Sequence, residues 1–179
     1  MMPIAPLMIE HRLIERMIRV MKKEIDLIGK TGKARPEFID EAVDFIRTYA
    51  DRCHHGKEED ILFKQLSEKR LSDHYRHVVE ELVEEHARAR TMTGNLVSAK
   101  ERYLAGDAKA LDEIKGTMTQ LVDFYPLHIE KEDRHFFIPC MEYFSSREQD
   151  VMLEAFYEFD RTLIHDKYRG VIERFEGKR

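Results

Sequence analysis

Two similar segments decide the fold: HHGKEED at residues 54–60 and HIEKED at residues 128–133. Each reads His-x-x-Lys-Glu-acid, and a phenylalanine follows at the same distance, Phe63 and Phe137. Each segment therefore places a glutamate four residues after a histidine. Residues i and i+4 lie on one face of an α-helix, about one turn apart. The two segments predict two helices that each present an imidazole and a carboxylate to a shared interior.

A further histidine precedes each segment at a similar distance. His11 lies 43 residues before His54, and His86 lies 42 residues before His128. Each of these upstream histidines follows a glutamate and is followed six residues later by a methionine. We interpret the chain as two copies of one unit, a helix with a single histidine followed by a helix with His-x-x-x-Glu. A pseudo-two-fold relation between the copies would bring all four histidines into one layer of the core.

The composition predicts an all-α protein. The 179 residues suit one domain, with 42% hydrophobic and 36% charged residues but only 8 glycines and 5 prolines. We find no sustained alternation of apolar and polar residues, the signal of a strand. Long helices with short connections favour antiparallel neighbours. We predict an up-down-up-down four-helix bundle in residues 1–144, with an additional C-terminal helix in residues 145–179 packed against the bundle.

Proline, glycine and capping residues predict the helix ends. We expect Pro6 to open the first helix and Gly29–Gly32 to end it, and Pro36 to open the second. Ser72 is predicted to cap a third helix that runs to about Gly106, and Asp107 to cap the fourth. Ser146 with Gln149 is predicted to form a capping box for a fifth helix that ends near Phe175. Within the fourth helix we expect Pro126 to cause a kink just before His128.

Charge and cysteine content exclude several classes of protein. The net charge is −5 and no basic block occurs, which argues against a nucleic-acid partner. No apolar run approaches the length of a membrane span and no signal-peptide pattern is present, so we expect a cytoplasmic protein without a membrane partner. We interpret Cys53 and Cys140 as reduced, buried thiols.

The two histidine–glutamate pairs and the two upstream histidines form one candidate set of metal ligands: His11, His54, Glu58, His86, His128 and Glu132. Six ligands are too many for one tetrahedral zinc ion. They suit two metal ions that share bridging carboxylates and keep a coordination position open. Imidazole and carboxylate ligands without sulfur favour iron, or manganese in its place, and zinc is a further substitute.

The residues around these candidates allow two interpretations. Four acidic residues flank the ligands in sequence: Glu10, Glu59, Glu85 and Asp133. Each could orient an imidazole by accepting its second N–H, or it could be a solvated surface charge. The apolar residues after the motifs, Ile61, Leu62, Phe63, Phe136 and Phe137, are predicted to pack in the core and to keep the site dry.

The other histidines are assigned outside the ligand set. His55 points about 100° away from His54 on an α-helix and is at most part of the outer layer of the site. His77 faces the side opposite His86, and His74 lies near the start of the same helix. His135 lies two turns beyond His128, which favours packing or gating. We expect a structural role for His165.

The motifs HHGKEEDILF and HIEKEDRHFF, with IEH and EEH upstream, resemble the hemerythrin-like (HHE cation-binding) domain over about residues 7–140. The resemblance implies a four-helix bundle with a non-haem di-iron centre, and the six candidates match its ligand positions. The chain departs from the oxygen-carrying members at Leu82, where those proteins have a further histidine one turn before the third-helix ligand. One fewer imidazole implies a more open iron and argues against reversible oxygen storage.

Three functions follow from this resemblance. The first is a di-iron protein that binds or senses a small diatomic gas, oxygen or nitric oxide, or that handles iron. The second is a di-iron enzyme that reduces peroxide, oxygen or nitric oxide, or repairs damaged iron centres. The third is a structural bundle with a vestigial site, against which the intact ligands in both halves argue. Neither the redox partner nor the oligomeric state follows from the sequence.

Overall fold

The computed structural model describes the backbone of residues 2–175 and the side chains of residues 2–163. Within residues 2–175 the chain forms helices joined by turns, and it contains no strand. The predicted all-α class is confirmed. In this described part no helix is long and apolar enough to cross a membrane.

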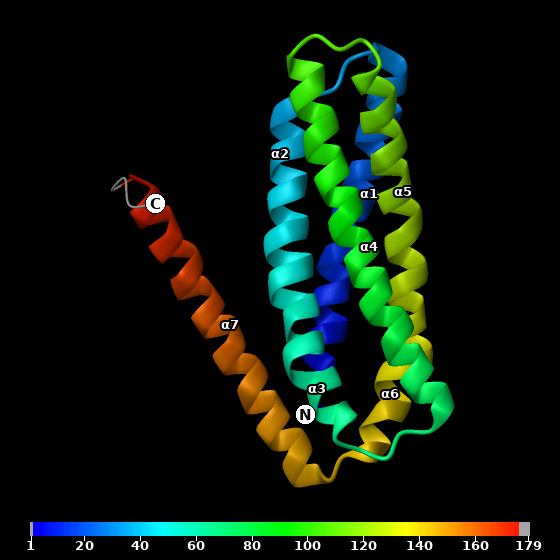
Figure 1. Ribbon diagram of the computed structural model, residues 1–179, viewed down its shortest axis with the longest axis vertical. Coiled ribbons are helices and arrows are strands. Elements are labelled where there is room, and N and C mark those ends of the chain that lie inside the picture. Colours follow the sequence, from blue (N-terminus) through cyan, green and yellow to red (C-terminus); the bar gives the residue numbers. More distant parts are fainter. Residues whose placement is uncertain (1, 176–179) are drawn as a thin grey trace.

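Four long helical segments of the described chain run up, down, up and down beside one another (Figure 1). The first is α1 (Ile4–Thr31), and the third is α4 (Asp73–Leu104). The second combines α2 (Pro36–Phe45), η1 (Ile46–His55), η2 (Glu58–Phe63) and α3 (Lys64–Ser67). The fourth combines α5 (Ala110–Lys131), η3 (Glu132–Phe136) and α6 (Phe137–Cys140), followed by the short 3₁₀ turn η4 (Met141–Tyr143). The C-terminal helix is α7 (Ser146–Phe175).

Three predicted helix ends are confirmed. Gly32 adopts the left-handed conformation (φ 65°) that closes α1, and its N–H donates to the carbonyl of Ile28 at 2.8 Å. Pro36 occupies the first turn of α2, where its missing N–H costs nothing. Ser72 caps α4 by accepting a hydrogen bond from the backbone N–H of Tyr75 at 3.3 Å.

Three other predictions of local structure are wrong in position. The first helix begins at Ile4, so Pro6 lies inside its first turn. Helix α5 begins at Ala110, because Asp107 instead stabilises the preceding turn by accepting the N–H of Lys109 at 2.9 Å. Pro126 lies inside α5, which continues to Lys131, and the kink expected just before His128 stays a prediction.

The third error concerns the capping box of α7, which lies one residue earlier than predicted. The hydroxyl of Ser145 accepts the N–H of Glu148 at 3.4 Å, and Glu148 accepts the N–H of Ser145 at 2.8 Å. Both Ser-x-x-Glu and Ser-x-x-Gln occur here, and the sequence pattern alone does not separate them. Gln149 instead donates to the carbonyls of Met141 and Phe144, at 3.2 Å each.

The interior consists of two apolar clusters with a polar layer between them. The larger cluster fills the end of the bundle that holds the α4–α5 turn, with members such as Ile14, Ala50 and Ala89. The other includes Leu7, Leu62 and Leu82. Since each helix passes from one cluster to the other through a histidine, the polar layer crosses all four helical segments at one level.

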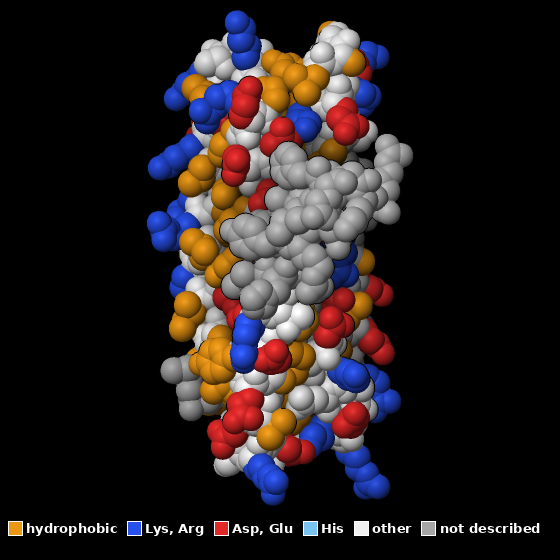
Figure 2. Space-filling model, turned by 90° about the vertical axis from the view of Figure 1, so that its left-hand side faces the viewer, with side chains coloured by type: hydrophobic (Ala, Val, Ile, Leu, Met, Phe, Trp, Pro, Cys, Tyr) orange, Lys and Arg blue, Asp and Glu red, His pale blue; other side chains and the backbone are white. Residues whose placement is uncertain are grey.

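Helix α7 leaves the bundle end that holds η4 and packs against the second helical segment (Figure 1). Met152 and Phe156 are buried in this contact. Gly56 is required there, because a Cβ atom at this position would lie 2.7 Å from the ring of Phe159. Acidic and basic side chains interleave over the described surface on this face (Figure 2). The predicted packing of a fifth helix on the bundle agrees with this arrangement, and the domain division at residue 144 stays a prediction.

Candidate metal centre

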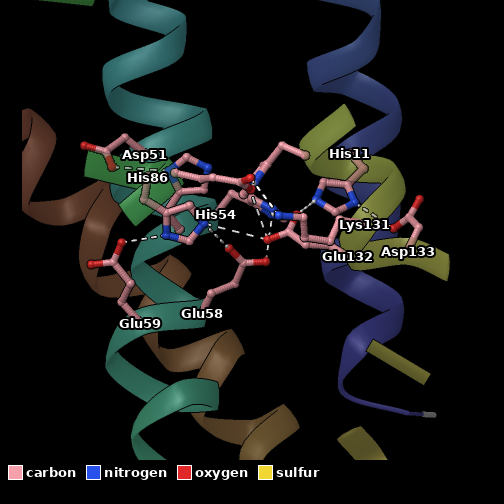
Figure 3. Close-up of polar contacts among 12 residues, drawn as sticks. His11, Asp51, His54, Glu58, Glu59, His86, Lys131, Glu132 and Asp133 are labelled. Atoms are coloured by element: carbon pink, nitrogen blue, oxygen red, sulfur yellow. Dashed lines mark hydrogen bonds and ion pairs between the residues drawn. The ribbon is translucent and has the colours of Figure 1, made fainter. Parts of the chain in front are cut away.

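The six candidate ligands come together in the polar layer between the two apolar clusters (Figure 3). Helix α1 contributes His11, the second segment contributes His54 and Glu58, α4 contributes His86, and the fourth segment contributes His128 and Glu132. All six are almost completely buried, with 0–2% of their surface exposed. Charged or polar groups are buried at this density only when they are paired or bind an ion.

The two glutamates lie between the two pairs of histidines. Oε1 of Glu58 is 3.4 Å from Nε2 of His54, and Oε2 is 3.4 Å from Nε2 of His86. Oε2 of Glu132 is 3.1 Å from Nε2 of His11, and Oε1 is 3.3 Å from Nε2 of His128. Each carboxylate therefore turns one oxygen towards the histidines of the first repeat and the other towards those of the second.

Eight atoms of these six residues have no hydrogen-bond partner: Nε2 of His11, His54, His86 and His128, and both carboxylate oxygens of Glu58 and Glu132. The short distances between them do not satisfy hydrogen-bond geometry, because the atoms converge on shared points instead of pairing. Unpaired buried polar atoms are rare in folded proteins, and each requires a partner. The residues present fit metal ions held by imidazole nitrogens and carboxylate oxygens.

The opposite nitrogen of each imidazole meets a carboxylate. Nδ1 of His11 is 2.7 Å from Asp133, and Nδ1 of His86 is 2.7 Å from Glu59. The other two contacts join Nδ1 of His54 to Glu10 at 2.9 Å and Nδ1 of His128 to Glu85 at 2.8 Å. The four flanking acids thus contact the four histidines of the cluster. Of the two interpretations that the sequence allows, the structure supports ring orientation over a solvated surface charge.

This arrangement fixes the tautomer of all four rings. A carboxylate can only accept a hydrogen bond, so the proton of each neutral imidazole lies on Nδ1. Nε2 then carries the free lone pair and points into the layer. Such carboxylate–histidine pairs orient the ring and increase its basicity in metal sites.

Two lysines of the motifs hold two of these acids in place. Lys57 donates to Glu10, and Lys131 donates to Glu85 at 2.7 Å. These lysines occupy matching positions in the two repeats. Lys57 is fully buried, whereas the side chain of Lys131 is 28% exposed.

The electrostatics of the cluster favour bound cations. Burial and the charge of Glu132 raise the pKa of Glu58 well above its usual value. Burial lowers the pKa of His54 to about 4, whereas contacts with Asp133 and Glu132 overcome the burial of His11 and raise its pKa to about 9. The raised pKa values of Glu58 and His11 mean that both groups hold their protons more tightly than usual when no metal is bound. Metal ions would replace those protons and balance the two carboxylates.

Apolar side chains close the layer on the side of α6. The ring of Phe137 stacks on His11 at 5.6 Å, and the ring of Phe63 stacks on His86 at 6.0 Å. Leu82 is fully buried in the adjacent cluster. Each copy of the repeat thus supplies one phenylalanine that stacks on a histidine of the other copy. These rings exclude water from that side of the layer, as the sequence predicts. Ile61, which was also predicted to pack in the core, is only partly buried.

The remaining histidines divide into exposed and buried residues. His74, His77 and His135 are exposed, so the predicted packing role of His135 is wrong. The side chain of His165 lies outside the described residues. His55 is 1% exposed, and its ring stacks on His86 at 3.8 Å with an angle of 9° between the rings.

The prediction that places His55 away from the layer assumes an α-helix, but η1 is a π-helix. A π-helix has a wider turn, with hydrogen bonds from i to i+5, so consecutive side chains diverge less. Both His54 and His55 therefore face the interior. The sequence analysis allows His55 a place in the outer layer of the site, and the structure places its ring against that of His86.

Comparison with known proteins gives one family and three relatives. The model of the hemerythrin HHE cation binding domain matches residues 2–139. The relatives are the uncharacterized protein Mb2018 of Mycobacterium bovis and the uncharacterized proteins MT2051 and Rv1995 of two Mycobacterium tuberculosis strains. Each is 24% identical to this chain over 151 residues, which cover 84% of this chain and 58% of the relative. The chain thus spans little more than half of their length. No solved structure matches this chain.

Proposed function

The chain belongs to the hemerythrin HHE cation-binding domain family, and on that premise we propose that it is a non-haem di-iron protein that binds oxygen or nitric oxide. Metal binding is the established part of this function. The identity and number of the metal ions, the gas, and the cytoplasmic location are our proposal. The two free cysteines, Cys53 and Cys140, are in keeping with a reducing compartment.

The proposal is supported mainly by the eight polar atoms of the candidate ligands that converge in one buried layer without hydrogen-bond partners. We assign His11 and His54 to one metal ion, and His86 and His128 to the other. Glu58 and Glu132 would help to hold both ions, because each turns its two oxygens to different pairs of histidines. Each ion would then receive two nitrogen and two oxygen ligands from the protein.

Four protein ligands leave room on an ion that prefers six, which favours iron and an exogenous ligand. Bound iron would supply redox chemistry in this layer. The protein contributes a rigid ligand set and the apolar wall made by Phe63, Phe137 and Leu82. Such a wall admits small, weakly polar molecules and excludes bulk water. A di-iron enzyme is the second candidate, favoured by a cavity on the opposite side of the layer whose lining includes His55, Tyr125 and three arginines.

The test is elemental analysis of protein purified from iron-replete cells, together with its optical spectrum before and after reduction and exposure to each gas. We expect two iron ions per chain and spectral changes with nitric oxide or oxygen. One zinc ion per chain without iron would overturn the proposal. Rapid turnover of oxygen or peroxide with a supplied reductant would favour the enzyme.

A further inference from the structure

A cavity of about 390 Å³ lies between the second helical segment, α4 and α5, next to the candidate metal centre. Its buried lining includes His55 (1% exposed) and Tyr125 (0% exposed), together with Ile46, Ala89 and Thr93. Three exposed arginines line its outer part, Arg47, Arg52 and Arg90. The cavity contacts the metal layer through His55, whose ring stacks on His86.

Nε2 of His55 and the hydroxyl of Tyr125 have no hydrogen-bond partner. Among the side chains of residues 2–163, the only other buried nitrogen or oxygen atoms without a hydrogen-bond partner belong to the six candidate ligands. Both residues line the same cavity. Because a buried polar group without a partner is costly, two of them beside one cavity indicate a polar occupant.

The geometry argues against His55 as a further metal ligand. A histidine nitrogen binds a metal ion in the plane of its ring. The rings of His55 and His86 are nearly parallel and their centres are 3.8 Å apart. An ion in the plane of the His86 ring would therefore lie outside the plane of the His55 ring, although a nitrogen of His55 lies within 4.8 Å of nitrogens of both His86 and His128.

The hydrogen-bonding character of the two residues is complementary. Nδ1 of His55 lies 3.4 Å from Asp51, a carboxylate that also accepts from Arg90 at 2.7 Å. This contact places the ring proton on Nδ1 and leaves Nε2 as an acceptor. The hydroxyl of Tyr125 provides a donor. The cavity thus offers one acceptor and one donor to its occupant.

The internal repeat supports a specific role for this side of the layer. Position 129 corresponds to His55 in the second copy, and it holds Ile129, a buried core residue. Both copies contain the ligands, the flanking acids and the stacked phenylalanines. Only the first copy adds a polar residue at this position, so the metal layer itself does not require it.

We propose that this cavity binds a small neutral molecule that carries both a hydrogen-bond donor and an acceptor, as hydrogen peroxide and hydroxylamine do, with His55 and Tyr125 as its hydrogen-bonding residues. The proposal rests on the proposed function, because the bound molecule lies next to the metal pair. It differs from that function in the ligand: oxygen and nitric oxide have no hydrogen to donate.

The first test needs no metal. Crystals of the metal-free protein are soaked in hydroxylamine, and the cavity is compared in the wild type, Tyr125→Phe and His55→Gln. We expect hydroxylamine within hydrogen-bonding distance of Tyr125 and His55 in the wild type and its loss in both variants. A cavity without hydroxylamine in the wild type would overturn the proposal even if the protein binds iron.

The second test uses iron-loaded protein and compares the rates of reaction with hydrogen peroxide and with nitric oxide. We expect Tyr125→Phe and His55→Gln to lower the peroxide rate roughly tenfold, the effect of one hydrogen bond, and to change the nitric oxide rate less than twofold. Tyr157→Phe, at an exposed tyrosine of α7, is the matched control. Iron content is measured for each variant. Loss of iron in His55→Gln would make His55 a ligand, and equal effects on both rates would indicate a general distortion; either result overturns the proposal.

Discussion

Nζ of Lys57 lies 3.0 Å from Oδ2 of Asp160 on α7 and also donates to Glu10. One buried ammonium group therefore joins the C-terminal helix to the carboxylate that holds His54. Lys131 is its counterpart in the second repeat, and it pairs with Glu81 and Glu85, which both lie on α4. The repeat is thus symmetrical in its metal layer but asymmetrical in how it contacts α7.

This contact predicts unequal effects for two equivalent substitutions. Lys57→Met leaves two carboxylates without their shared cation, and we expect it to lower the free energy of unfolding by about 3 kcal/mol. Lys131→Met removes a partly exposed pair and should cost less than about 1 kcal/mol. Urea denaturation of both variants measures the difference. Equal losses would mean that Lys57 is not held between α7 and Glu10.

Removal of a bridging carboxylate should affect both metal subsites. We expect Glu58→Ala to retain less than half of the wild-type iron, because each of its oxygens faces a different pair of histidines. His135→Ala is the control, since His135 is exposed and belongs to no metal group. Iron per chain is measured after identical purification. Full retention in Glu58→Ala would refute the ligand assignment.

The flanking acids should tune metal affinity without binding the metal. Glu85→Gln keeps the shape of the side chain but weakens the contact with Nδ1 of His128, and we expect metal affinity to fall roughly 10- to 100-fold. Glu84→Gln, at the exposed neighbouring position, should leave the affinity unchanged. Competition with a chelator gives both values. A similar loss in both variants would point to net charge instead of ring orientation.

The residue at position 82 should control the reaction with oxygen. Leu82 lies in the apolar cluster one turn before His86, so the reduced protein is expected to autoxidise instead of cycling as an oxygen carrier. Leu82→His should slow autoxidation by adding a nitrogen ligand, whereas Leu82→Met should change it little because its volume is similar. Stopped-flow absorbance after mixing with oxygen measures both. A long-lived, reversible oxygen adduct in the wild type would contradict this argument.

The capping box of α7 gives a pH-dependent contribution to stability. Hydrogen bonds from Lys69 and Ser145 lower the pKa of Glu148 from 4.5 to about 2. A carboxyl group with a lowered pKa stabilises the fold above its unfolded pKa, and this contribution is lost as the pH falls towards 2. Glu148→Gln should therefore lower the melting temperature at pH 7, and the difference from the wild type should shrink below pH 4.5. A difference that stays constant down to pH 3 would show that the charge of Glu148 is not involved.

The sequence determined the helical class, the two-fold repeat and the candidate ligands, because these depend on spacing along one helix. His54 and Glu58 share a face whatever their surroundings, as do His128 and Glu132. The apolar residues on either side of each motif place these pairs at the level where two core clusters meet. Pairs of this kind are local, and four residues of sequence are enough to predict them.

The tertiary structure decided which acid meets which imidazole, the inward position of His55 and the attachment of α7. Glu10 contacts His54 across 44 residues of sequence, and Lys57 contacts Asp160 across 103. Such contacts depend on the rotation and relative height of neighbouring helices, which packing sets. The π-helix of η1 also changes the direction of every side chain along it, and nothing in the spacing of His54 and His55 reveals that the helix is wider there.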